Sequence, residues 1–189
     1  MEALGSIFTA FGLSASAGLN AYIPLLVISL LARYTDFINL SSPWDTLESP
    51  WIIGLLAFLI LVEFFADKFP AVNHINDAIQ TFIRPVAGAL LFAASAKVIT
   101  DVHPIISLAS GLLVAGSVHA VKSLAVRPAV TATTAGAGNA PVSILEDIVA
   151  GMVSILSIVI PILFATLAII ITSWVVWKMW YRSVAKRPA

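Results

Sequence analysis

Long apolar stretches alternate with short polar ones along the chain. Windows with few charged residues cover residues 4–31, 50–65, 85–99, 104–121 and 148–180. A membrane-spanning helix needs about 20 predominantly apolar residues, so these windows predict a series of spanning helices. Proline begins three of them, at Pro50, Pro85 and Pro104, which suits the first helical turn because no backbone donor is needed there.

The last window is long enough for either one tilted helix or two short ones that meet near Pro161. We favour two. The sequence therefore predicts an all-α integral membrane protein with about six transmembrane helices. These form a single domain with halves at residues 1–99 and 104–182 and a basic tail at 183–189.

Two apolar stretches are interrupted by small and polar residues. FGLSASAGLNAYIP covers residues 11–24, and TATTAGAGNAPVSI covers residues 131–144. Irregular backbone at membrane depth survives only inside protein or beside a water-filled cavity, so both predict re-entrant segments. Aligning Asn20 with Asn139 places NAYIPLL over NAPVSIL and suggests a short internal repeat, a pattern that points to a transporter-like site.

Composition narrows the class further. The chain is 60% hydrophobic and 11% charged, whereas soluble domains carry about 25% charged residues. The formal net charge is zero, so no basic face is available for nucleic acid. The chain has no cysteine, which excludes disulfides, thiolate catalysis and cysteine-ligated metals.

Six spans would place both termini on one side of the membrane. Most basic residues then share that side, namely Lys68, Arg84, Lys122, Arg127 and those after residue 177. Arg33 and Lys97 fall on the other side. The positive-inside rule therefore predicts cytoplasmic N- and C-termini in an inner or plasma membrane.

A helix that begins inside a membrane presents unpaired N–H groups and a positive dipole end, which suit an anion or a lipid headgroup. The predicted ligand cradle contains Asn20, Thr133, Thr134, Gly136, Gly138 and Asn139. Alternatively, small residues only allow helices to pack closely. We prefer that interpretation for Ser107, Gly111 and Ala115.

Ionisable residues in or near a membrane often mark a transport pathway or a proton relay. Arg84 and Arg127 each precede a proline, which would place a guanidinium at a helix start, where it can bind an anion bidentately. The predicted proton-coupling residues are Glu63, Asp67, His119, Glu146 and Asp147. The alternative is that these groups reach the membrane interface, which we prefer for Lys68, Lys122 and Asp77.

Catalytic motifs are absent from the sequence. It contains no HExxH, GxSxG or Walker pattern. We therefore predict no catalytic residue, no metal site and no cofactor, and we expect that the chain is not an enzyme.

The unusual polar stretches also carry a resemblance to a known family. They are GLSASAGLNAYIPLL, EFFADKFPAVNHINDAIQTFIRPVAGALL and HAVKSLAVRPAVTATTAGAGNAPVSILED. In these stretches the chain resembles the small multi-pass membrane proteins known as domain of unknown function 4126. The resemblance extends over most of the chain up to Trp177. It implies a helical membrane fold and no particular activity.

The leading functional prediction is a transporter or flippase for a small anionic solute or lipid headgroup, coupled to protons. Its partners would be the lipid bilayer, that ligand and further copies of the chain in a homo-oligomer. One alternative is a scaffold that binds other membrane proteins through Ser107, Gly111 and Ala115. Another is a lipid-modifying enzyme that holds Mg²⁺ between the pairs Glu63/Asp67 and Glu146/Asp147.

Overall fold

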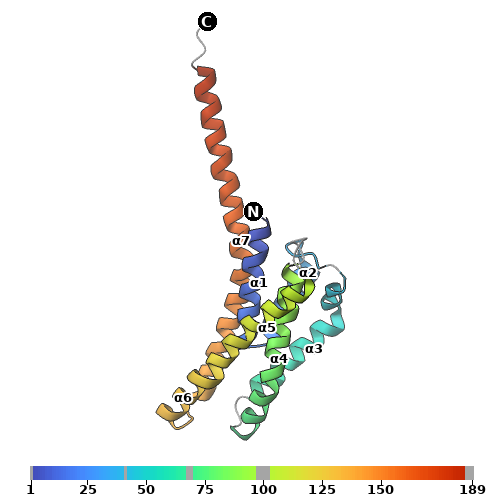
Figure 1. Cartoon of the computed structure of the whole chain (residues 1–189), viewed down its shortest axis with the longest axis vertical. Helices are drawn as coiled ribbons and strands as arrows, with labels where there is room; N and C mark the ends of the chain where they lie inside the picture. Colours follow the sequence, from blue (N-terminus) through green and yellow to red (C-terminus); the bar gives the residue numbers. More distant parts are fainter. Residues whose placement is uncertain (1, 41, 67–69, 97–102, 186–189) are drawn as a thin grey trace.

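The computed structural model describes residues 2–40, 42–66, 70–96 and 103–185, and almost all of these residues are helical (Figure 1). The elements in order are α1 (Glu2–Leu19), α2 (Tyr22–Tyr34), a 3₁₀ turn η1 (Trp44–Glu48), α3 (Pro50–Ala66), α4 (Pro70–Ala96), α5 (Pro104–Val121), a π turn η2 (Lys122–Val126), α6 (Arg127–Thr134) and α7 (Asn139–Ala185). The described residues contain no strand, and the all-α prediction is confirmed for them.

Helix α1 lies at the centre of the bundle, in contact with α4, α5 and α7. Its small polar residues bond to carbonyls of its neighbours. The Ser14 hydroxyl donates to the Gly88 carbonyl at 2.9 Å, and the Ser16 hydroxyl donates to the Ala150 carbonyl at 2.7 Å. These residues therefore form a packing surface. The interruption predicted within residues 11–24 is confined to Asn20 and Ala21.

Helices α4 and α5 approach closely because glycines face each other at their contact. A Cβ atom on Gly88 would lie 2.8 Å from the Gly111 carbonyl oxygen, a distance that side chains do not tolerate. Gly111 and Ala115 lie at this contact, and Ser107 is buried on the same helix. Their predicted packing role is confirmed.

Prolines begin two of the three predicted helices. Pro50 begins α3 and Pro104 begins α5, as predicted. The helix start predicted at Pro85 is wrong because Pro85 lies inside α4. The buried residues that follow, including Ala87 and Leu91, pack against the core, and this packing offsets the one backbone hydrogen bond that the proline removes.

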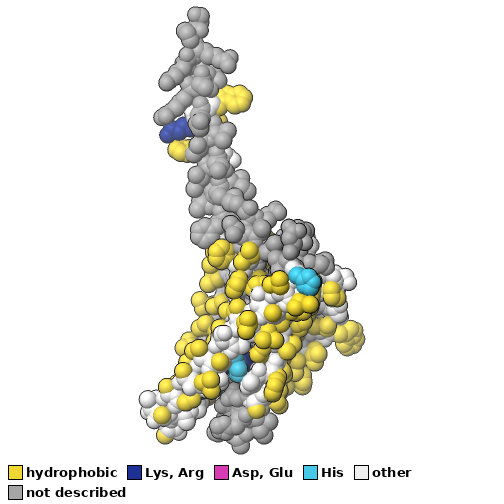
Figure 2. Space-filling view, viewed as in Figure 1, with side chains coloured by type: hydrophobic (Ala, Val, Ile, Leu, Met, Phe, Trp, Pro, Cys, Tyr) yellow, Lys and Arg dark blue, Asp and Glu magenta, His cyan; other side chains and the backbone are white. Residues whose placement is uncertain are grey.

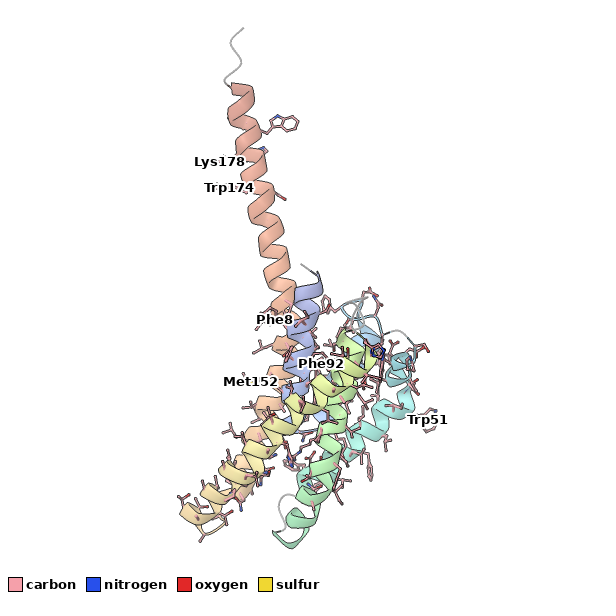
Figure 3. All side chains as sticks on the ribbon, in the orientation of Figure 1. Phe8, Trp51, Phe92, Met152, Trp174 and Lys178 are labelled. Atoms are coloured by element: carbon pink, nitrogen blue, oxygen red, sulfur yellow. The ribbon has the colours of Figure 1, made fainter. Side chains whose placement is uncertain are left out.

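Helix α7 continues through Pro161 as a single helix of 47 residues. The prediction of two short helices meeting at Pro161 is therefore wrong. The distal part of α7 projects away from the other helices (Figure 1). Trp174 and Lys178 lie on this part (Figure 3), with the Lys178 ammonium 4.6 Å from the centre of the Trp174 ring.

Three segments are long and apolar enough to cross a membrane: Ala78–Ser95, Pro104–Thr134 and Asn139–Pro161. Shorter apolar helices occupy Gly5–Leu19, Tyr22–Tyr34 and Pro50–Ala66. Hydrophobic side chains cover most of the described part of the face in Figure 2. Many large hydrophobic side chains are exposed on the described helices, while several charged and polar side chains are buried between them.

Candidate functional site

The break between α1 and α2 is organised by Asn20, which is 1% exposed. Its side-chain oxygen accepts hydrogen bonds from the backbone N–H groups of Tyr22 and Ile23, at 3.0 and 3.1 Å. These bonds satisfy donors that a helix start leaves unpaired. Its amide nitrogen donates to Asp147 Oδ1 at 2.9 Å. One side chain therefore caps α2 and joins the break to α7.

Lys122 binds the other side of the same break. Its ammonium donates to the Leu19 carbonyl at 2.8 Å, one of the carbonyls that the end of α1 leaves without a helical partner. The ammonium also lies 2.9 Å from Glu146 Oε2, and Arg127 lies 2.8 Å from the same oxygen. A single carboxylate thus holds two cations.

The π turn η2 explains how Lys122 and Arg127 reach one carboxylate. Residues five apart in an α-helix point about 140° away from each other. In η2 the Arg127 N–H donates to the Lys122 carbonyl, so Arg127 lies one turn beyond Lys122 on the same face. This face continues the buried stripe of α5, which ends at His119. Turns of this kind are frequent at functional sites.

A second ionic group joins α3, α4 and α5. Arg84, which is 1% exposed, forms an ion pair with Glu63 at 2.9 Å. Its other terminal nitrogen lies 3.1 Å from His119 Nδ1, and His119 Nε2 lies 3.1 Å from the Thr81 hydroxyl. The four side chains form a row from buried Glu63 to exposed Thr81.

The two groups lie close enough to interact electrostatically, since Glu63 is attracted by Lys122, whereas Lys122 is repelled by Arg84. We call the set the ion network and define it as Asn20, Glu63, Arg84, His119, Lys122, Arg127, Glu146 and Asp147. It contains three carboxylates and three cationic side chains. Its formal charge is zero when His119 is neutral, and this balance lowers the cost of burying charge.

Several buried polar atoms in this region have no hydrogen-bond partner among the described residues. They are Glu63 Oε2, Gln80 Oε1 and Arg84 Nε. Buried polar atoms in native proteins are normally paired. In and beside the ion network, these atoms can therefore form further hydrogen bonds.

Comparison with known families places residues 7–181 in the domain of unknown function DUF4126. The chain belongs to this family. The match includes every residue of the ion network, and it confirms the resemblance seen in the polar stretches. No curated protein and no solved structure matches the chain. The function of this DUF4126 chain must therefore be argued from its geometry.

The structure brings most of the predicted site residues together, although their ligand and coupling roles remain predictions. Those that meet in the ion network are Asn20, Glu63, Arg84, His119, Arg127, Glu146 and Asp147. The arginines are placed differently from the prediction. Arg84 lies within α4, and Arg127 follows η2 without a break, so neither lies at a free helix start, and each is paired with a glutamate.

The remaining predicted cradle residues lie at the end of α6, in the turn that follows and at the start of α7, away from Asn20. Ala135 and Gly136 adopt positive φ angles of 51° and 87° there. The Gly138 N–H donates to the Thr134 hydroxyl at 2.9 Å. Thr133 is exposed as well. The second interruption thus occurs within the predicted range as a turn at the protein surface.

Asn139 begins α7 and bonds to Thr131 at 3.0 Å. Asn20 instead contacts Asp147, eight residues further along α7. The two interrupted segments therefore do not face each other. The turn forms its hydrogen bonds locally, whereas the break at Asn20 is joined to α7 and η2.

The predicted position of Lys122 at the membrane interface is wrong, because Lys122 is 4% exposed and paired. Its spacing of three residues from His119 is the sequence signal that places both on one helix face. Arg84 and Arg127 are buried too, so these three residues lend no support to cytoplasmic termini.

Asp67, a predicted coupling residue, lies outside the described residues, as does Lys68. Among the described residues, no group of three or more His, Asp or Glu side chains is arranged to hold a metal ion. Glu63 and Glu146 each face a cationic side chain. The arrangement suits the exchange of ionic partners.

Proposed function

We propose that this chain is a multi-pass membrane protein that transports or flips a small anionic solute or a lipid headgroup, coupled to protons. The observation that carries the proposal is the ion network, buried between helices whose outer faces are apolar. Ionisable groups in such a place are costly and are usually retained for function. A network assembled around a helix break resembles the way transporters build their sites.

The membrane location is supported by the three long apolar segments and by the large apolar side chains on their outer faces. Helix α7, with 47 residues, is about 70 Å long. That length exceeds about 30 Å of hydrocarbon, so only part of α7 lies within the bilayer. With α7 as a single crossing, about six crossings require α1 and α2 to cross separately, and we retain that arrangement, with cytoplasmic termini, as part of the proposal.

Charge balance supports coupling to protons. Arg127 and Lys122 already share the Glu146 carboxylate. A substrate anion that binds Arg127 would add a negative charge to a neutral network, which is unfavourable at low dielectric. Protonation of Glu146 removes one negative charge and releases its cations. An anion and a proton then enter together with no net change in charge.

The same exchange can operate at the Glu63–Arg84 pair. Glu63 Oε2 and Arg84 Nε have no hydrogen-bond partner among the described residues. A bound anion would accept hydrogen bonds from the guanidinium while protonation neutralises the charge of the carboxylate. Glu63 and Glu146 are therefore the coupling residues in this proposal, with Arg84 and Arg127 as the anion ligands.

The other two functional classes gain less support. The scaffold hypothesis used Ser107, Gly111 and Ala115, which are buried against other helices of the same chain and are not exposed to a partner. The enzyme hypothesis used carboxylate pairs, of which Glu63 and Glu146 are occupied by basic side chains.

Proton-driven uptake in proteoliposomes tests the proposal. Purified protein would be given an inward pH gradient and, in turn, phosphate, sulfate, short carboxylates and a fluorescent phospholipid. We expect the protein to move one of these substrate classes in a proton-dependent manner. Glu146→Gln should remove the dependence on pH, and Arg127→Ala should abolish the movement. Asp45→Asn, at an exposed acid outside the ion network, is the matched control. Full activity in both network variants would refute the assigned roles.

A further inference from the structure

A cavity opens on the side of the bundle between α4 and the end of α5. Its volume is about 490 Å³, within the range of about 300–1,000 Å³ found for small-ligand sites. Small residues on both helices leave this space, namely Ala78, Gly116 and Ala120. The polar residues at the cavity are Thr81, His119 and Ser123.

The cavity reaches the ion network through His119. The His119 Nε2 atom lies 3.1 Å from the Thr81 hydroxyl, and its Nδ1 lies 3.1 Å from Arg84. Further along the same row of contacts, Glu63 accepts a hydrogen bond from the other terminal nitrogen of Arg84. In this row, the first formal charge beyond the cavity wall is therefore a cation, which favours an acidic ligand.

The cavity opens through surfaces that suit hydrocarbon. Its walls belong to Ala78–Ser95 and Pro104–Thr134, two of the segments able to cross a membrane. Leu124 at the cavity is 79% exposed, and Phe82, which follows Thr81, is 77% exposed. A free anion would meet an apolar surface here, whereas a lipid brings acyl chains that match it.

We infer that this cavity is a lateral binding site for a lipid with an acidic phosphate headgroup. The phosphate lies at Thr81 and His119, where it is attracted by Arg84, and the acyl chains lie along the apolar surface beside Phe82 and Leu124. The inference rests on the proposed function and deepens it, because it assigns the substrate to acidic phospholipids that enter from the bilayer.

Glycine positions provide a matched pair of variants. A Cβ on Gly116 would have only Pro85 Cγ nearby, at 3.8 Å, and a Cβ on Gly54 would have nothing within 4 Å. Gly116→Phe therefore places a ring in the cavity from a position where its Cβ meets no close atom, and the buried charges of Arg84 and Glu63 stay unchanged. Gly54→Phe adds the same side chain to the exposed face of α3 and serves as the control.

Native mass spectrometry of the full chain in mild detergent, titrated with phosphatidylglycerol or phosphatidylcholine, tests the inference. We expect the wild type and Gly54→Phe to retain phosphatidylglycerol over phosphatidylcholine. Gly116→Phe should retain roughly tenfold less phosphatidylglycerol. Millimolar inorganic phosphate should not displace the lipid. If Gly116→Phe does not remain monodisperse, Ala120→Phe fills the same cavity.

Equal retention of both lipids by the wild type, or undiminished retention in the cavity-filling variant, overturns the lipid site. Displacement by inorganic phosphate overturns it in favour of a free anion. Uptake of a small anion that is unaffected by Gly116→Phe would leave the transport proposal standing without the lipid site. Selective lipid binding with no movement of any substrate would leave the lipid site standing without transport.

Discussion

Asn20 and Asn139 hold matching places in the two interrupted segments, yet their surroundings differ. Asn20 is buried, caps α2 and bonds to Asp147 across the bundle. Asn139 bonds to Thr131, eight residues away, at the protein surface. Similar local sequence thus supports a helix break inside the bundle in one case and a surface turn in the other.

The difference comes from what lies beside each segment. The break at Asn20 is bound by Lys122 through the Leu19 carbonyl and by Asp147 through the Asn20 amide. The turn after α6 is stabilised by its own Thr134 hydroxyl and by a glycine at positive φ. Buried irregular backbone requires partners from other elements, whereas exposed backbone can bond locally or to solvent.

The largest effect is expected from removing the carboxylate that anchors the break. Glu146→Ala would leave Lys122 and Arg127 buried without their anion, and losing one partner of a buried ionic group costs about 3–5 kcal/mol. Unfolding by heat or denaturant in detergent should show this loss. The double variant Glu146→Ala with Lys122→Met removes one charge of each sign and should recover part of it. No recovery would mean that charge balance is not what stabilises the network.

The next effect separates the two asparagines directly. Asn20→Ala removes the cap of α2 and the bond to Asp147, and we expect a loss of about 2 kcal/mol. Asn139→Ala removes a bond to an exposed threonine and should cost under about 1 kcal/mol. Both can be measured under the same detergent conditions. Equal losses would contradict the distinction between break and turn.

Glycine replacements test the same contrast between the buried break and the surface turn, here through packing and backbone strain. A Cβ on Gly18 would lie 2.6 Å from the Ala115 carbonyl oxygen, so Gly18→Ala should overpack the region before the break and cost about 1–3 kcal/mol. Gly136→Ala meets no close atom but places alanine at a φ of 87°, which should cost about 1 kcal/mol. Thermal unfolding of the two variants shows which one loses more stability. A larger loss for Gly136→Ala would mean that packing is tighter at the turn than before the break.

Much of the architecture followed from the sequence because it depends on local apolar content. The helical class, the starts at Pro50 and Pro104 and the small-residue packing at Gly111 were all predicted and are confirmed. The start at Pro85 failed because buried packing after a proline can hold a helix together. The break at Pro161 failed because local sequence does not determine whether a proline ends a long helix.

The sequence predicted which residues form the candidate site better than it predicted which of them pair with each other. Seven of the predicted residues meet, as the contacts around Arg84 and Glu146 show. Their partners could not be predicted, because pairing depends on which helices are neighbours. Lys122 illustrates the point, since only the π turn places it beside Arg127, and periodicity at 3.6 residues separates the two.

The smallest expected effect concerns Thr133, a predicted cradle residue in the turn region. Its hydroxyl donates to the carbonyls of Ala129 and Val130 within its own helix, at 2.8 and 3.2 Å, and it is exposed. Thr133→Ala should change stability by no more than about 0.5 kcal/mol and leave proton-coupled flux at the wild-type level. Flux and unfolding are measured on one preparation, with Asn20→Ala in parallel. A loss of flux with unchanged stability would bring the α6–α7 turn back into the transport path, because the exposed Thr133 hydroxyl bonds to carbonyls of its own helix and could then affect flux only through what passes beside it.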